Sequence, residues 1–110
     1  MTRDETIALI RAQLKDKALS ERKMMGSLIF MLGEHMCCGV GEDRILLRLG
    51  ENGAAKACTE PHVTAMMMGE KPAKGYVHVA AAGYPDAAAL AKWVGMAEAF
   101  VKTLPPKKKP

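Results

Sequence analysis

The sequence predicts an α+β fold of two layers, in which helices pack on one face of an antiparallel, five-stranded sheet. Apolar residues recur at helical spacing near both ends of the chain, and the stretch between contains short apolar or alternating segments separated by glycine-containing turns. At 110 residues the chain can bury one modest core but not two. We therefore expect one domain over residues 1–104, with elements in the order α-β-β-β-α-β-β-α, and a flexible basic tail over residues 105–110.

The first helix is indicated by its cap and its periodicity. Thr2 and Glu5 have the spacing of a capping box, and the apolar residues that follow them predict an amphipathic helix to about Lys17. Residues 24–32 are then continuously apolar, which favours a central strand covered on both faces or nearly so. A hairpin turn is expected at residues 33–34, because glycine accepts the positive φ that such turns need.

The middle of the chain is expected to continue the antiparallel sheet. The returning strand is expected over residues 35–40, and a turn at residues 41–43 follows it. Residues 44–49 alternate between two faces, which is typical of a strand and completes a three-stranded antiparallel unit. Gly50 ends that strand, and the alanine-rich segment over residues 51–58 predicts a short helix.

The last third of the chain predicts two strands and a helix. The strands are expected over residues 64–69 and 75–80, with a turn at residues 70–72 between them. Asp86 can cap the last helix, and Pro105 stops it. The buried stripe of this helix follows three-four spacing through Leu90, Trp93, Val94, Ala97, Phe100, Val101 and Leu104.

Four segments in one order resemble the N-terminal domain of the TfoX/Sxy competence regulators. They are RKMMGSLIFMLGEHMCCGV from Arg22, DRILLRLG from Asp43, KPAKGYV from Lys71 and LAKWVGMAEAFVKTLPPK from Leu90. The resemblance implies helices packed on an antiparallel sheet, and a regulatory domain that acts through protein partners rather than by catalysis. Met25 stands where the family usually has phenylalanine and Cys37 where it usually has an aromatic residue. The second, C-terminal domain of competence regulators is not among these residues, so their role in transcriptional coactivation is not carried over.

The net charge of +4 describes the tail more than the domain. Lys107, Lys108 and Lys109 supply three of the four charges, which leaves +1 on residues 1–106. A domain this close to neutral lacks the clustered basic face that binding to several phosphates requires. We expect nucleic-acid contacts at most through the tail. No segment has the length of a membrane span, so no membrane partner is expected.

The cysteines favour a reducing compartment, and the prediction is a cytoplasmic protein. Cys37, Cys38 and Cys58 are odd in number, a vicinal disulfide is awkward, and no signal peptide opens the chain. His35, Cys37 and Cys38 form the only cluster of nucleophile and base, so a thiol enzyme or a metal site is the alternative function. We instead predict that at least one of Cys37 and Cys38 is buried and that there is no enzyme activity, because cysteine is among the most buried residue types and a catalytic thiol needs an exposed electropositive site. No metal or other cofactor is expected, because neither C-x-x-C nor H-x-x-x-H spacing occurs.

The strand over residues 44–49 also predicts a binding surface. If its apolar alternate positions face the helices, the intervening side chains lie on the other face of the sheet. The residues expected to bind a partner there are Arg44, Arg48, Tyr76 and His78, with Leu46 between the arginines. Arginine offers forked donors to carboxylates and tyrosine offers a rigid contact, so an acidic protein partner is favoured. An ordinary solvated sheet face is the alternative.

Small residues form a second stripe on the last helix. Ala88, Ala91, Gly95 and Ala99 are spaced by three, four and four positions. Such a stripe permits close approach of another element, which in a short chain can come from a second copy. We therefore expect a homodimer, with the high helix propensity of alanine as the alternative explanation.

Overall fold

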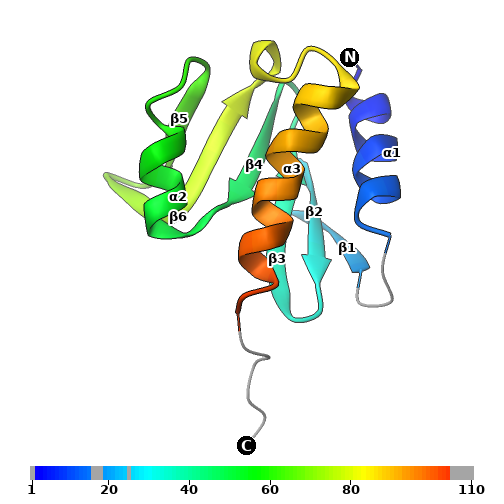
Figure 1. Cartoon of the computed structure of the whole chain (residues 1–110), viewed down its shortest axis with the longest axis horizontal. Coiled ribbons are helices and arrows are strands. Elements are labelled where there is room, and N and C mark those ends of the chain that lie inside the picture. Colours follow the sequence, from blue (N-terminus) through cyan, green and yellow to red (C-terminus); the bar gives the residue numbers. More distant parts are fainter. Residues whose placement is uncertain (1, 16–18, 25, 105–110) are drawn as a thin grey trace, which may run out of the picture.

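The computed structural model describes residues 2–15, 19–24 and 26–104, so the predicted basic tail and Lys107 to Lys109 lie outside the described residues. Figure 1 shows the chain from blue to red. Its elements are α1 (Arg3–Gln13), β1 (Leu19–Met24), β2 (Ser27–Leu32), β3 (His35–Val40), β4 (Arg44–Arg48), α2 (Gly50–Ala57), β5 (Val63–Met68), β6 (Lys71–Ala80), the 3-10 turn η1 (Ala81–Gly83) and α3 (Ala87–Val101).

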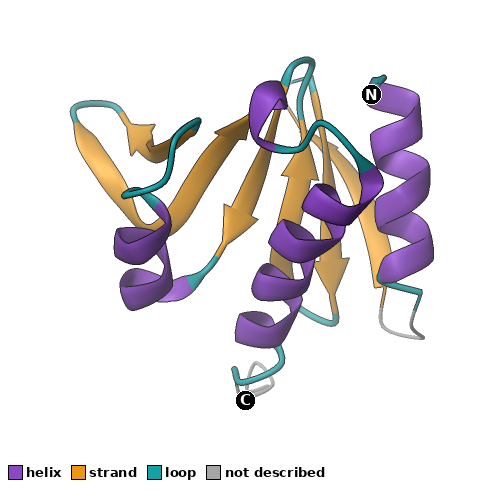
Figure 2. Cartoon of the chain, turned by 45° about the horizontal axis from the view of Figure 1, so that its top comes forward, coloured by secondary structure: helices purple, strands orange, loops and turns teal. Residues whose placement is uncertain are grey.

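The strands form one antiparallel sheet in the order β1-β2-β3-β4-β6-β5. All three helices lie on the same side of it: α1 and α3 run side by side near β3 and β4, and α2 covers β6 (Figures 1 and 2). No described helix covers the opposite side, which we call the open sheet face. The predicted α+β class and two-layer arrangement are confirmed, whereas the predicted number of five strands is wrong, because the sheet has six.

The strand missed by the sequence analysis is β1. Residues 24–32 were expected to form one strand, but residues 19–24 form a separate edge strand that pairs with β2 along its full length. Every β1 residue after Leu19 is exposed, so no alternation of apolar and polar residues marks the strand. Gly26, at a φ of +83°, lies in the turn that separates β1 from β2.

β2 is buried on both of its faces, although helices lie over only one of them. Leu28, Phe30 and Leu32 belong to the core beneath the helices. Ile29 lies on the open sheet face and is nevertheless only 7% exposed. It lies over Gly39 of β3, where an added Cβ would come within 2.7 Å of the Ile29 Cδ1 atom. The strand is thus covered on both faces or nearly so, as expected. On the open sheet face the cover comes from the neighbouring strand, where Gly39 has no side chain and leaves room for Ile29, and not from a second layer of helices.

The second half of the sheet also differs from the prediction. β6 begins at Lys71 rather than at residue 75, and the turn before it is shorter than expected. Only β5 pairs with the start of β6, because the β4 ladder ends where Arg48 meets Tyr76. Pro72 is tolerated within this strand, since this part of β6 has a described neighbour on one side only.

Both predicted helix caps are present. The Thr2 hydroxyl accepts a hydrogen bond from the Glu5 backbone N–H at 3.0 Å, and the Thr2 backbone N–H donates to the Glu5 carboxylate at 2.8 Å. The Asp86 carboxylate accepts from the backbone N–H three residues later at 2.9 Å. These bonds satisfy donors that the first turn leaves unpaired. α1 ends at Gln13, earlier than predicted, and Lys17 lies outside the described residues.

The apolar stripe of α3 supplies one layer of the core. Its buried residues are Leu90, Trp93, Val94, Ala97 and Val101, which follow the predicted three-four spacing. Phe100 and Leu104, also predicted for this stripe, are only half-buried, and the helix ends at Val101 instead of continuing to Pro105. The indole N–H of Trp93 donates to the Gly83 carbonyl at 3.0 Å, so its polar atom is paired although the ring is buried. None of the helices in the described part of the chain combines the length and the apolar character needed to cross a bilayer.

α1 of the same chain reaches the small-residue stripe of α3. The Gln13 amide Nε2 donates to the Ala91 carbonyl at 2.9 Å, and a Cβ added at Gly95 would lie 3.5 Å from that nitrogen. Ala88 and Ala99 are exposed. Part of the small-residue stripe is thus already in contact with α1 of the same chain. The homodimer stays a prediction.

Two glycines allow α2 to begin directly against β6. Gly50 and Gly75 have φ values of +79° and +84°. The Leu49 backbone N–H donates to the Gly75 carbonyl at 2.8 Å. A Cβ added at Gly75 would lie 3.1 Å from the Gly50 Cα, and one added at Gly50 would overlap the ring of Phe100. The contact joins the start of α2 to the end of α3, and side chains at either glycine would force the segments apart.

Candidate interaction face

The four residues predicted to bind a partner all lie on the open sheet face. Arg48 is paired with Tyr76, and Leu46 is paired with His78, across β4 and β6. Arg44 lies two positions before Leu46 on β4. The β4 residues between the arginines are fully buried under the helices. Because side chains alternate along each strand, the three β4 residues and the two β6 residues paired across from them lie on the other side of the sheet.

Arg48 and Tyr76 form a stacked pair. The Arg48 Cζ atom lies 5.7 Å from the centroid of the Tyr76 ring, and both residues are half-buried. A guanidinium over an aromatic face is attracted by the ring quadrupole and loses some of its rotational freedom. The pair is therefore a partly ordered cation with donors left over for another group.

His78 adds an aromatic surface rather than a third charge. Burial, and then the positive charge of Arg44, lower the pKa of the His78 imidazole below its usual range. A depressed pKa leaves the ring neutral at neutral pH. The positive charge of the face at that pH therefore comes from its arginines.

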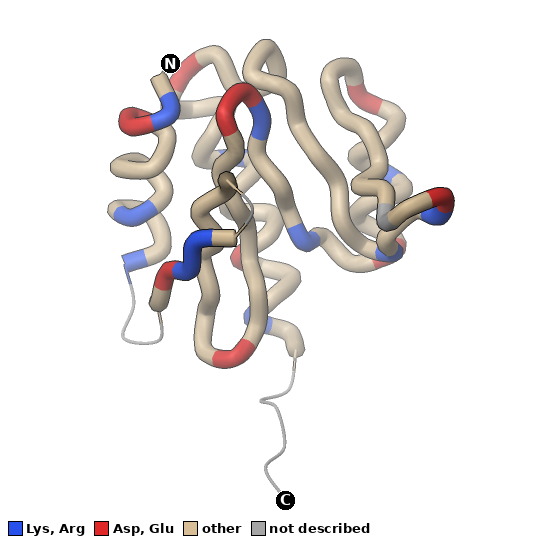
Figure 3. The backbone as a smooth tube through the Cα atoms, turned by 180° about the vertical axis from the view of Figure 1, so that it is seen from behind, with Lys and Arg blue, Asp and Glu red and all other residues tan. Residues whose placement is uncertain are grey.

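The open sheet face carries arginines without carboxylates along its strands. Arg22 of β1 pairs with Ile29, which places it on the same face as Arg44 and Arg48. Among the described residues, no Asp or Glu occupies a paired strand position of this face. Glu21 is the one acidic residue within the described strands, and the other red segments in Figure 3 lie in turns and helices. The Glu21 side chain reaches α1 on the other side of the sheet. The face is complementary in charge to an acidic partner.

The centre of the face has an apolar floor that the sequence analysis missed. Ile29 is buried, and Leu46 and the pair Met31 and Met36 are half-buried on this face. The signal in the sequence was Gly39, because glycine within a strand often marks close approach by another group. An apolar centre with a basic border is a common composition for a protein-binding surface.

The thiol cluster has a structure that opposes nucleophilic chemistry. The register between β2 and β3 shifts at Phe30, so Cys37 is an extra residue in β3, and the neighbouring Cys37 and Cys38 both belong to the core instead of alternating between the two faces. Cys37 and Cys38 are both fully buried. A hydrogen bond with Cys37, burial and the Glu98 charge raise the pKa of the Cys38 thiol well above its usual value. A reactive thiol needs the opposite shift.

The described residues contain no group of three or more His, Cys, Asp or Glu side chains that is placed to hold a metal ion. The alternative of a metal or thiol centre at His35, Cys37 and Cys38 therefore receives no support from side-chain placement, and the absence of a cofactor stays a prediction.

Thiol labelling tests the burial of this cluster. We expect one thiol per native chain to react rapidly with an alkylating reagent and two to react slowly, because Cys58 is exposed whereas Cys37 and Cys38 are buried. The measurement is mass spectrometry over time. Cys58→Ser should remove the rapid phase, and denaturant should make the remaining thiols react at one rate. Rapid labelling of all three cysteines in the native protein would contradict the arrangement.

The model of the TfoX N-terminal domain family matches residues 12–101 of the chain. The match contains all of the open sheet face, the thiol cluster and nearly all of the core. No curated protein and no solved structure gives a significant match.

Proposed function

Because the chain belongs to the TfoX N-terminal domain family, we propose that it is a non-enzymatic regulatory module whose open sheet face binds an acidic segment of a protein partner. The observation that carries the proposal is the combination of Arg44, Leu46 and Arg48 on one strand with Tyr76 stacked on Arg48. An uncovered sheet face with this composition offers charge, apolar area and an ordered aromatic group together.

The composition of the face favours a particular kind of partner. Carboxylates suit the arginines, because a guanidinium can donate two parallel hydrogen bonds to one carboxylate. The half-buried Leu46 and the methionines beside it suit apolar side chains that alternate with those carboxylates. A segment rich in Glu or Asp with Leu or Ile at intervals would match both features.

Two other functions have less support. A thiol-based activity conflicts with the raised pKa of Cys38. A nucleic-acid adaptor is expected to act through Lys107 to Lys109, which lie outside the described residues. We place the module in the bacterial cytoplasm, since three cysteines of which two are vicinal favour a reducing compartment.

Peptide titration tests the proposal. The probe is a twelve-residue peptide of Glu, Leu and Ser, compared with the same peptide carrying Lys for Glu. We expect the acidic peptide to shift the backbone amide resonances of Leu46, Arg48 and Tyr76, and the basic one to leave them unchanged. Arg48→Glu should lower the affinity for the acidic peptide by about tenfold or more, because the new carboxylate repels the carboxylates of the peptide.

Lys15→Glu is the matched control, since Lys15 is exposed just beyond the C-cap of α1 and the substitution makes the same change in net charge away from the face. Circular dichroism of both variants checks that the fold is kept. Equal weakening by the two variants would indicate attraction to net charge alone and would remove the open sheet face as the binding site.

A further inference from the structure

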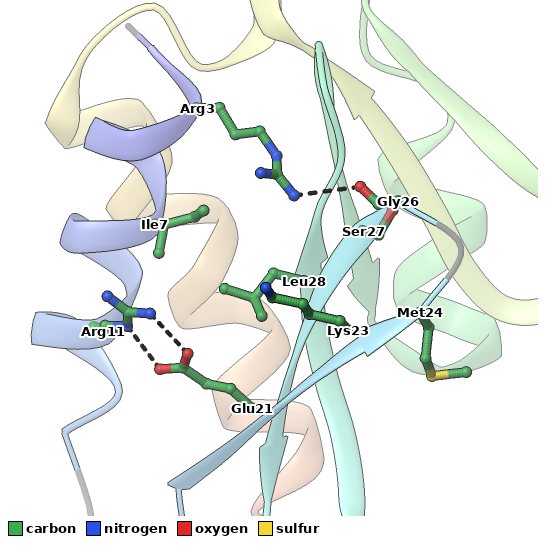
Figure 4. Close-up of a pocket in the computed structure, with 9 residues that line it drawn as sticks. All are labelled: Arg3, Ile7, Arg11, Glu21, Lys23, Met24, Gly26, Ser27 and Leu28. Atoms are coloured by element: carbon green, nitrogen blue, oxygen red, sulfur yellow. Dashed lines mark hydrogen bonds and ion pairs between the residues drawn. The ribbon is translucent and has the colours of Figure 1, made fainter.

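A pocket of about 460 Å³ lies between α1 and the β1–β2 hairpin, on the helix side of the sheet and distinct from the open sheet face (Figure 4). Its size is within the range of pockets that hold small molecules. The lining that matters here comes from α1 with Arg3, Ile7 and Arg11, and from the hairpin with Glu21, Lys23 and Leu28.

The pocket exists because β1 presents charges where a helix would need apolar side chains. Glu21 and Lys23 pair with Phe30 and Leu28, which face the helices, so the two charged residues face α1 as well. Charged groups resist dry packing, since their desolvation costs free energy. α1 contacts α3 and β3 instead, and a polar gap remains above β1.

Two bridges hold the sides of the gap together. The Arg11 guanidinium donates two hydrogen bonds to the Glu21 carboxylate, from Nε at 2.7 Å and from Nη2 at 2.8 Å. Nearer the start of α1, Arg3 Nη2 donates to the Gly26 carbonyl at 3.3 Å. Lys23 extends from β1 toward α1 between these bridges (Figure 4).

The lining has more positive than negative charge. Three cations and one carboxylate line the pocket, which leaves a net charge of +2. The Arg11 hydrogen bonds lower the pKa of Glu21, so that carboxylate is ionised and already bound. Lys23 makes no ion pair or hydrogen bond with another residue in the described part of the chain. Arg3 uses one of its five N–H donors in the long bond to Gly26.

The wall between the cations is apolar. Ile7 and Leu28 are 9% and 8% exposed and line the pocket from its two sides. We propose that this pocket binds a small organic anion, a carboxylate with a short aliphatic chain. Lys23 and Arg3 hold the carboxylate, and Ile7 and Leu28 contact the chain. The excess charge selects the head group, and the apolar wall selects a ligand with a tail over a bare anion.

Hexanoate is the probe for the first experiment, in which binding is followed by two-dimensional amide NMR. We expect its addition to shift the resonances of Ile7, Lys23 and Leu28, and we expect weaker binding above physiological salt. Hexanol lacks the charge, acetate lacks the chain and phosphate tests an anion of another kind, so each should bind several-fold more weakly. Hexanol binding as well as hexanoate, or shifts confined to other parts of the protein, would overturn the proposal.

Two substitutions of opposite sign complete the test. Lys23→Gln should lower the affinity for hexanoate by about tenfold, because it removes one charge-assisted hydrogen bond. Glu21→Gln should tighten it, because the variant removes the only carboxylate of the lining and frees Arg11. Lys15→Gln, outside the pocket, should leave the affinity unchanged.

Partial unfolding would lower the affinity for hexanoate, so it could not explain a gain of affinity in Glu21→Gln. This variant therefore separates an effect on binding from an effect on stability. If Glu21 and Lys23 only protect the edge of the sheet from pairing with other chains, neither substitution changes hexanoate binding, and the proposal is wrong. The open sheet face is unaffected by either variant, so the acidic-peptide titration stands or fails independently.

Discussion

Gly50→Ala is expected to lower the free energy of unfolding by about 3 kcal/mol. Two costs combine at this position. The φ of +79° is unfavourable for any residue with a Cβ, and the new methyl group would overlap the Phe100 ring. The ring cannot withdraw freely, because Phe100 packs against the core at the end of α3. Urea unfolding followed by circular dichroism measures the change.

Gly69→Ala is the matched control for this prediction. Gly69 also has a positive φ, +64°, but an added Cβ would meet no atom within 4 Å. This variant should therefore show only the cost of the backbone strain, about 1 kcal/mol. The difference between the two variants isolates the contact that joins α2 to α3. Equal losses of stability would mean that the contact between Gly50 and Phe100 is not formed.

Phe30→Ala should lower the free energy of unfolding by about 4 kcal/mol, because it empties the largest of the fully buried side-chain positions. That is a large part of the roughly 5–15 kcal/mol that stabilises a typical domain. Phe30 pairs with Cys38 across β2 and β3, so the cavity would open beside the buried thiols. The labelling of Cys37 and Cys38 should therefore become faster as stability falls, as mass spectrometry can measure.

Met31→Ala provides the comparison within the same strand. Met31 lies on the open sheet face and is only half-buried, so its loss should cost about 1 kcal/mol and leave the slow labelling phase nearly unchanged. Similar destabilisation by the two substitutions would show that the open sheet face is packed as tightly as the core, and the proposed binding surface would then be buried.

The parts of the fold that the sequence predicted correctly are those with a strong local signal. The Thr2 and Asp86 caps, the stripe of α3 and the alternation along β4 each depend on residues within a few positions of one another. The alternation of β4 also placed Arg44 and Arg48 on the face opposite the core. Site residues on a strand with clear alternation, such as Arg44 and Arg48, can therefore be placed on the correct face from the amino-acid sequence alone.

The missed parts depend on contacts between distant segments. β1 is a strand because β2 lies beside it, and its exposed residues carry no pattern of their own. Ile29 is buried on the open sheet face because Gly39 of another strand leaves room for it. The extra residue at Cys37 appears only in the register between β2 and β3, which a single strand cannot encode by alternation.

The sequence by itself therefore determined the class of the fold, the helix caps and which side of β4 faces solvent, since these follow from short-range spacing. Only the tertiary structure decided the sixth strand, the apolar floor around Leu46 and the pocket between α1 and β1. Arg3 and Lys23 show the reason: they are twenty positions apart on elements that share no local pattern. They meet at one pocket because the sheet pairing turns Lys23 toward the helix.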